Sequence, residues 1–193
     1  MPRRENTGRR RPSPLPPRCT ILVYCGGIRT ERDYFEALKQ QLRASSLTVR
    51  IRQAGIAPDA LVQAAAAYRD RRPGVFDEVW CVVDVDEFDI AAAAAEARRS
   101  AISLAVSNPC FELWLLLHHA DCQSYCNGCQ DVHRRLRKHV PGYDKSRIDI
   151  VRFADGVDDA VKRAKALDPS GTTYEKNPST GAWQVVEQIR NAR

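Results

Sequence analysis

The chain has 193 residues, of which 44% are hydrophobic, and this is enough for one domain around a single core. No apolar run approaches the roughly 20 residues needed to cross a bilayer, and no charged-then-apolar signal pattern opens the chain, so we expect a soluble, cytoplasmic protein with no membrane partner. Seven cysteines, an odd number in a chain of this length, favour reduced thiols or a metal site over a disulfide framework.

The formal net charge of +6 is concentrated at the amino end. Residues 1–18 hold six of the 30 basic and one of the 24 acidic residues, which leaves 24 basic against 23 acidic residues in the rest. Residues 1–17 are also rich in proline and have little to bury, which predicts a disordered basic tail before one domain over residues 18–193. This tail either contacts phosphates without sequence preference or is a solubilising leader with no dedicated partner.

Strands and helices alternate along the first half of the chain. A buried strand over residues 19–25 ends at Gly26-Gly27, and a helix follows from about Glu31, where Thr30 and Asp33 have capping-box spacing. The next elements are a half-exposed strand near a sheet edge, an alanine-rich helix, a buried strand, a second alanine-rich helix and a short strand, at residues 47–52, 58–71, 79–83, 90–96 and 102–106. This order predicts a mainly parallel sheet with helices on both faces, a three-layer Rossmann-like α/β fold.

Two aspartates stand at the carboxyl end of the 79–83 strand. Asp84 and Asp86 are two residues apart, so their carboxylates point the same way on an extended chain. Such a pair holds a hard divalent cation, and ligands of open parallel sheets bind beyond the carboxyl ends of the strands. Glu31 would open on the same rim and can share the site. An Asp-rich turn with Asp89 as a helix N-cap is the alternative, and both descriptions can hold together.

Helices dominate from Asn108 onwards. Residues 111–119 are apolar almost all round, which is typical of a buried helix. Glu112 is the charged exception, so it lies either at an exposed helix start or beside a cation or a metal. Two further helices are predicted at residues 158–167 and 179–191.

The segment after the buried helix is rich in cysteine and histidine. Cys122, Cys126, Cys129 and His133 have spacings that suit a structural zinc site. A loop of reduced thiols is the alternative, while an iron–sulfur cluster of the radical-enzyme type needs a barrel that this chain is too short to form.

A basic run over residues 133–139 is the densest positive patch of the domain. Its candidates for phosphate contact with a nucleic acid are Arg134, Arg135, Arg137 and Lys138. A solvated helix face is the alternative explanation.

Five motifs resemble the RloB family over about residues 19–189. They lie at residues 21–35, 82–86, 107–118, 142–145 and 177–180, and the serine-asparagine-proline-cysteine-phenylalanine-glutamate string at 107–112 is the most specific. The family is similar to the Toprim nuclease domain of overcoming-lysogenization-defect proteins, and is associated with restriction and phage-defence loci that also encode an ATPase. The resemblance therefore implies a Toprim fold with additional C-terminal helices and a Mg²⁺- or Mn²⁺-dependent nuclease, acting on DNA or RNA in anti-phage defence such as abortive infection.

The resemblance also implies roles for individual residues. Asp84, Asp86 and Glu31 would hold Mg²⁺, and Glu112 and Lys145 would join them in catalysis.

One position departs from the family pattern. Where the family has a glutamate before a glycine, this chain has Gly26, which offers neither a ligand nor a base. Three outcomes are open: Glu31 substitutes, metal binding survives without cleavage, or the chain is a noncatalytic nucleic-acid-binding or ATPase-partner subunit of a defence complex. A homo-oligomer and the choice between DNA and RNA also stay open.

Overall fold

The structure is a computed structural model that describes residues 19–192 except 28, 45, 52–55 and 86–89. The predicted tail over residues 1–17, the predicted ligand Asp86 and the predicted cap Asp89 therefore lie outside the described residues.

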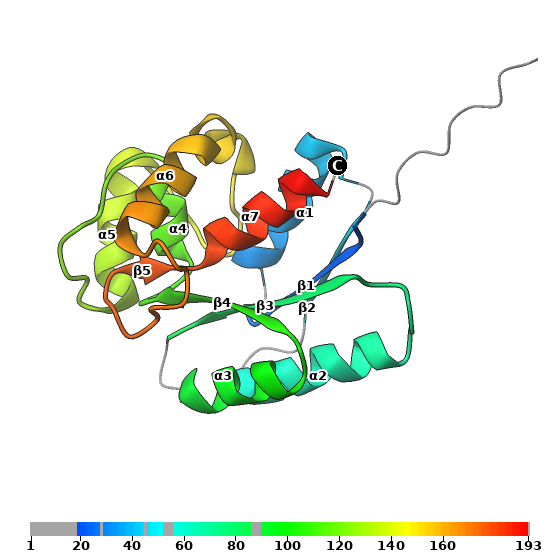
Figure 1. Ribbon diagram of the computed structural model, residues 1–193. Coiled ribbons are helices and arrows are strands. Elements are labelled where there is room, and N and C mark those ends of the chain that lie inside the picture. Colours follow the sequence, from blue (N-terminus) through cyan, green and yellow to red (C-terminus); the bar gives the residue numbers. More distant parts are fainter. Residues whose placement is uncertain (1–18, 28, 45, 52–55, 86–89, 193) are drawn as a thin grey trace, which may run out of the picture.

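A five-stranded sheet forms the centre of the domain (Figure 1). Its strands are β1 (Ile21–Cys25), β2 (Leu47–Ile51), β3 (Glu78–Asp84), β4 (Ser103–Asn108) and β5 (Ser179–Thr180). The order is β2-β1-β3-β4-β5; the first four strands are parallel, and β5 pairs antiparallel with β4. The predicted mainly parallel sheet is confirmed, with β2 at an edge as its half-exposed pattern indicated.

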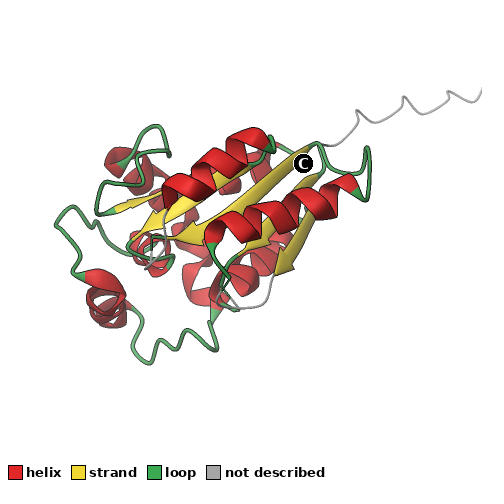
Figure 2. Cartoon of the chain, turned by 90° about the horizontal axis from the view of Figure 1, so that it is seen from below, coloured by secondary structure: helices red, strands yellow, loops and turns green. Residues whose placement is uncertain are grey.

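Helices cover both faces of this sheet (Figures 1 and 2). On one face lie α2 (Pro58–Asp70) and α3 (Ile90–Arg99), which pack on each other. On the other side lie α1 (Thr30–Leu42), α4 (Glu112–Leu117), α5 (Gly128–His139), the 3₁₀ helix η1 (Ile150–Gly156), α6 (Val157–Leu167) and α7 (Ala182–Asn191). The predicted three-layer Rossmann-like α/β fold is confirmed, and α6 and α7 are its additional C-terminal helices.

The inner strands are apolar on both faces because both faces are covered. All five residues of β1 are buried: the odd-numbered ones join the larger core under α1, and Leu22 and Tyr24 join the smaller core under α2 and α3. In β3, Trp80 and Val82 belong to the larger core. Since side chains alternate along a strand, Asp84 projects to that same side, where α1 and α4 begin.

Two local features differ from the sequence-based predictions. Helix α7 begins at Ala182 rather than at residue 179, because Ser179 and Thr180 pair with β4; two residues are too short for a strand pattern to be recognised. The capping box is wrong: Arg29 caps α1 without a side-chain hydrogen bond, and the Thr30 hydroxyl donates to the carbonyl oxygen of Lys145, 3.0 Å away. None of the described helices combines the length and the apolar composition required to cross a membrane.

Candidate functional site

Three carboxylates from three segments meet beyond the carboxyl ends of the central strands. Glu31 lies in the first turn of α1, Asp84 ends β3 and Glu112 begins α4. They are close enough to affect one another electrostatically: the charges of Glu31 and Glu112 both raise the pKa of Asp84, and Glu112 raises that of Glu31. The structure thus brings together three of the acids that the sequence singled out.

Asp84 is the acid of the three that has an unsatisfied buried oxygen within the described part of the chain. Its Oδ1 is buried and has no hydrogen-bond partner among the residues that the structure describes, although the residue as a whole is partly exposed. Burial, and then the charges of Glu31, Glu112 and Cys129, raise the pKa of Asp84 well above its ordinary value, against a hydrogen bond from the Phe111 backbone. A buried polar atom without a partner typically costs about 1–3 kcal/mol, so this oxygen is set up for a cation or a proton.

Glu31 is buried and stands directly over Gly27. Burial raises the pKa of Glu31 to about 7, and Glu112 adds to this, while backbone N–H groups of Glu31 and Gly27 and the charge of Lys145 oppose it. A Cβ on Gly27 would clash with the carboxylate oxygens of Glu31. Glycine at position 27 therefore leaves the space that the Glu31 carboxylate occupies.

Gly27→Ala is expected to weaken divalent-cation binding roughly 10- to 100-fold without unfolding the domain. The added methyl group must displace the Glu31 carboxylate, which can move because it is the end of a flexible side chain. Titration with Mn²⁺ measures the effect. Gly26→Ala is the matched control, because a Cβ there meets nothing closer than 3.4 Å. Equal Mn²⁺ affinity in the two variants would contradict a ligand role for Glu31.

Glu112 is the first residue of α4 but is buried, so the exposed helix start that was one alternative is wrong, and a place beside a cation or a metal stays a prediction. Its Oε1 accepts a hydrogen bond of 3.3 Å from the Tyr143 hydroxyl and lies 3.2 Å from Nε2 of His133. Burial alone would raise the pKa of Glu112, but His133 and a hydrogen bond from Cys110 outweigh it and hold the pKa below its ordinary value. Glu112 is therefore an anion surrounded by partners.

Lys145 reaches this cluster on a loop that docks onto the start of α1. Beside the Thr30 hydrogen bond to the Lys145 carbonyl, Nη1 of Arg29 donates to the Ser146 carbonyl at 3.0 Å. The Lys145 side chain is exposed, and its charge favours the ionised form of Glu31. Tyr143 of the same loop binds Glu112, so three separate sequence motifs converge here.

Gly26 ends the ladder between β1 and β3, where its N–H donates to the Val82 carbonyl at 3.0 Å. A Cβ at this position would meet Val82 O at 3.4 Å and the side chain of Leu61 at 3.6 Å, which are ordinary contacts. A side chain therefore fits here, but its Cβ would point toward α2, which lies on the opposite side of the sheet from Glu31 and Glu112.

The structure divides the cysteine and histidine residues that the sequence grouped as a zinc site. The sulfur atoms of Cys122 and Cys126 lie 3.5 Å apart, and Arg135 donates to Cys122 at 3.2 Å. A hydrogen bond from Cys126, with help from Arg135 and against burial, lowers the pKa of Cys122 to about 7. Cys129 instead lies 3.8 Å from the Pro109 carbonyl, and His133 lies beside Glu112.

A different set of metal-ligand atoms does come together. One ligand atom each from Cys110, Glu112 and His133 lies within 4.8 Å of the others. Cys110 was not singled out from the sequence, because its partner His133 is distant along the chain and joins it only through the packing of α5 on α4. The signal available in the sequence was the position of Cys110, two residues before Glu112.

The basic residues of α5 fall into two groups. Arg135 is engaged in the fold, with hydrogen bonds to Asp131, Ser124 and the Tyr125 carbonyl, and Arg134 also pairs with Asp131. Arg137 and Lys138 are exposed and form no ion pair within the described part of the chain.

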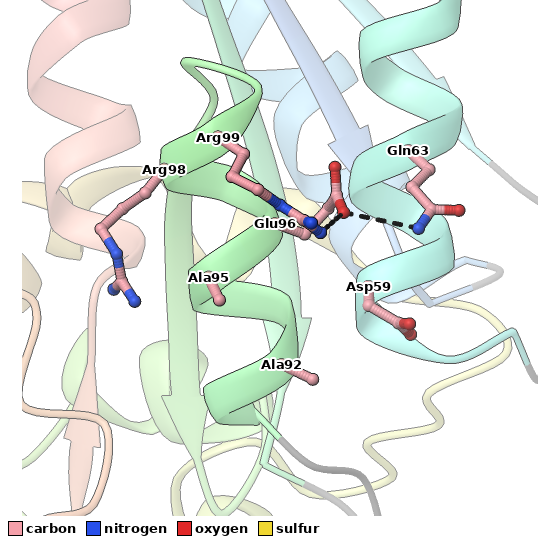
Figure 3. A pocket seen from close by; sticks show the side chains of 7 residues that line it. All are labelled: Asp59, Gln63, Ala92, Ala95, Glu96, Arg98 and Arg99. Carbon is pink, nitrogen blue, oxygen red and sulfur yellow. Dashed lines mark hydrogen bonds and ion pairs between the residues drawn. The ribbon is translucent and has the colours of Figure 1, made fainter.

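A cavity of about 510 Å³ opens between α2 and α3, on the other face of the sheet (Figure 3). Its lining is Asp59, Gln63, Ala92, Ala95, Glu96, Arg98 and Arg99. Glu96 is already bonded there to Gln63, Arg99 and Ser100. This cavity shares no residue with the carboxylate cluster, so the two are separate features.

Comparison with protein families matches residues 21–189 to the family described as RloB-like protein. Comparison with curated proteins and with solved structures found no match.

Proposed function

The chain belongs to the RloB-like family, and we propose that it is a divalent-metal-dependent nuclease of the Toprim type, which cleaves phosphodiester bonds of DNA or RNA in anti-phage defence. The observation that carries the proposal is the buried Oδ1 of Asp84, which has no hydrogen-bond partner in the described part of the chain and belongs to a carboxyl group whose pKa is raised by the nearby charges of Glu31 and Glu112. Three acids at one site, each buried in whole or in part, are costly unless a cation balances them.

The donor set fits Mg²⁺ or Mn²⁺. Both are hard cations that take oxygen ligands. Asp84 and Glu31 offer carboxylate oxygens at the carboxyl ends of the central strands, where ligands of such folds bind. When bound, such a cation neutralises phosphate charge and lowers the pKa of an attacking water. Asp86, the second aspartate of the predicted pair, lies outside the described residues, so the proposal rests on Asp84 and Glu31.

The other residues of the site would position and balance the reacting groups. Tyr143 donates to Glu112 and so fixes its carboxylate beside the other two acids. Lys145 is exposed and near Glu31, where an ammonium group can balance the charge that develops on a phosphate. The docking of its loop on α1 supports this role, because it limits how far Lys145 can move from the acids.

The test is an assay of purified protein on duplex DNA, single-stranded DNA and RNA with Mg²⁺ or Mn²⁺. We expect cleavage of at least one substrate, lost with a chelator and reduced by orders of magnitude in Asp84→Asn, because the residues of such a site act as a unit. Asp155→Asn is the matched control, since Asp155 is exposed in η1 and outside the cluster. No cleavage of any substrate, or full cleavage by Asp84→Asn, would refute the nuclease proposal.

Nucleic-acid binding is expected to depend on Arg137 and Lys138. Each phosphate contact contributes about 0.9 to the slope of log affinity against log salt on duplex DNA, so the double change Arg137→Ala/Lys138→Ala should reduce that slope by about 2. Binding measured at several salt concentrations checks this. The double change Arg98→Ala/Lys162→Ala removes the same charges from exposed positions on α3 and α6, and should leave the slope unchanged apart from the small effect of net charge. If both double variants have the same salt dependence, the phosphate contacts lie elsewhere on the protein.

A second candidate function is favoured by Gly26. With no side chain at the position where the family has a glutamate, the chain could bind metal and nucleic acid without turnover, as a noncatalytic subunit beside an ATPase. It predicts salt-sensitive binding with no cleavage under any metal, and cleavage that disappears in Asp84→Asn would rule it out.

A further inference from the structure

The start of α4 and one face of α5 bring sulfur, nitrogen and oxygen ligand atoms to one place. Cys110 lies in the connection from β4 to α4, Glu112 is the first residue of α4, and His133 is on α5. Their ligand atoms lie within 4.8 Å of one another. Tetrahedral zinc, with bonds of 2.0–2.3 Å, separates its ligand atoms by roughly 3.3–3.8 Å, so small adjustments would close this set around one ion.

Hydrogen bonding explains part of this arrangement but not all of it. Glu112 accepts hydrogen bonds from Tyr143 and Cys110, so its carboxylate is satisfied without a metal. Nε2 of His133 is buried and lies 3.2 Å from Oε1 of Glu112; its attraction lowers the pKa of Glu112, but the contact lacks the alignment of a good hydrogen bond. The two atoms can form an ion pair, and they are also about as close as two ligand atoms of one zinc ion, which lie roughly 3.3 Å apart or slightly more.

Cys129 is a fourth candidate ligand, although its Sγ is not among the atoms that lie within 4.8 Å of one another. It lies four residues before His133 on α5, and residues at this spacing share one face of a helix. Its thiol is hydrogen-bonded to that of Cys110. The four groups therefore come from two elements, two from the start of α4 and two from one turn of α5.

We propose that Cys110, Cys129, His133 and Glu112 form a zinc site that fastens α5 to the start of α4. Two thiolates, an imidazole and a carboxylate are donors that suit Zn²⁺, whereas Mg²⁺ prefers oxygen alone. The set differs from the one that the cysteine spacing predicts, because Cys122 and Cys126 contact each other and Arg135 instead. This site goes beyond the nuclease activity and does not depend on it.

Zinc here would also set the position of the neighbouring acids. Glu112 belongs to this site and to the carboxylate cluster, and Cys129 is near enough to Asp84 to raise the pKa of its carboxyl group. A metal that holds Glu112 and His133 would keep α5, with its exposed Arg137 and Lys138, in register with Asp84 and Glu31. The zinc ion would therefore be structural, and the hard cation would bind beside it.

Cobalt titration of the full-length protein, stripped of metal under reducing conditions, tests the proposal. We expect one equivalent of Co²⁺ to give thiolate-to-cobalt charge-transfer absorption and the intense visible bands of tetrahedral cobalt, both removed by Zn²⁺. His133→Gln and Cys110→Ser should weaken this binding by at least about tenfold. Should Cys110→Ser fail to fold, His133→Gln carries the test, because its ring is partly exposed.

Two control variants separate this site from its neighbours. Cys122→Ser should keep the cobalt spectrum, since Cys122 belongs to the other cysteine pair. Asp84→Asn should keep it too, so that failure of the zinc proposal is distinguishable from failure of the nuclease proposal. Absence of a thiolate band at one equivalent, or loss of binding in Cys122→Ser with retention in His133→Gln, would overturn the assignment.

Discussion

Asp84→Asn is expected to raise the melting temperature of the metal-free protein and to remove its stabilisation by Mg²⁺ or Mn²⁺. The pKa of Asp84 is raised in the folded state. Below about pH 4 the carboxyl group is protonated in both the folded and the unfolded state, so it does not lower the stability of the fold. As the pH rises, the unfolded state ionises first and the folded state loses stability relative to it. Asparagine cannot ionise, and its amide can donate to the neighbouring carboxylates while its oxygen keeps the Phe111 hydrogen bond.

The size of this gain follows from the unpartnered Oδ1 of Asp84. Giving an unpartnered buried polar atom a hydrogen-bond partner is worth roughly 1–3 kcal/mol, and each kcal/mol moves the melting temperature of a chain of this size by about 2–4 °C. Thermal unfolding at pH 4 and pH 8, with chelator and with Mn²⁺, measures both effects. Asp155→Asn should behave as the wild type throughout. A lower melting temperature for Asp84→Asn in chelator would show that the carboxylate is a structural group rather than a metal ligand.

Gly26→Glu is expected to increase both divalent-cation affinity and cleavage, because it restores the carboxylate that the family pattern has at the end of β1. The backbone accepts the change: Gly26 is outside the left-handed region, and its Cβ would make ordinary contacts at 3.4 Å and beyond. The side chain starts toward Leu61, so the glutamate must bend around the end of the sheet to reach Asp84. A glutamate has three bonds beyond Cβ with which to do so.

Gly26→Gln is the matched control for this gain, since it has the same size and no charge. Mn²⁺ titration and cleavage rates of the two variants and the wild type give the comparison. The expected order is Gly26→Glu above the wild type, with Gly26→Gln at or below it. Equal affinities in all three would mean that the first-strand position is not part of this chain's metal site and that Glu31 has taken over its role.

The patterns of apolar residues along the sequence predicted the central layers of the fold, because each pattern depends directly on which faces of a strand or helix are buried. The five apolar residues before Asp84 predicted a strand covered on both faces, and the strand is covered in this way. The same logic placed Glu31 and Asp84 on one rim, and the structure brings them together. In contrast, β5 is too short to have a pattern of its own, and its pairing with β4 is a contact between distant parts of the chain.

The parts of the site that were not predictable depend on tertiary packing. Thr30 has the spacing of a helix cap, but the loop of Lys145 competes for its hydroxyl. Cys122, Cys126 and Cys129 have the spacing of a metal site, yet the start of α5 turns Cys129 toward Cys110. Arg135 resembles a phosphate contact in sequence but binds Asp131 and the preceding loop in the structure.

We propose that Asp84 and Glu31 hold a divalent cation, and this claim can be tested by a Mn²⁺ titration at several pH values. The pKa of Glu31 is about 7, so below this value the cation must displace a proton and the affinity should fall by about tenfold per pH unit for each proton displaced. We predict Mn²⁺ binding to the wild type at pH 8, weaker binding at pH 6, and loss of binding in Asp84→Asn at both. Binding that is independent of pH and unchanged in Asp84→Asn, or no binding at pH 8, would contradict the claim.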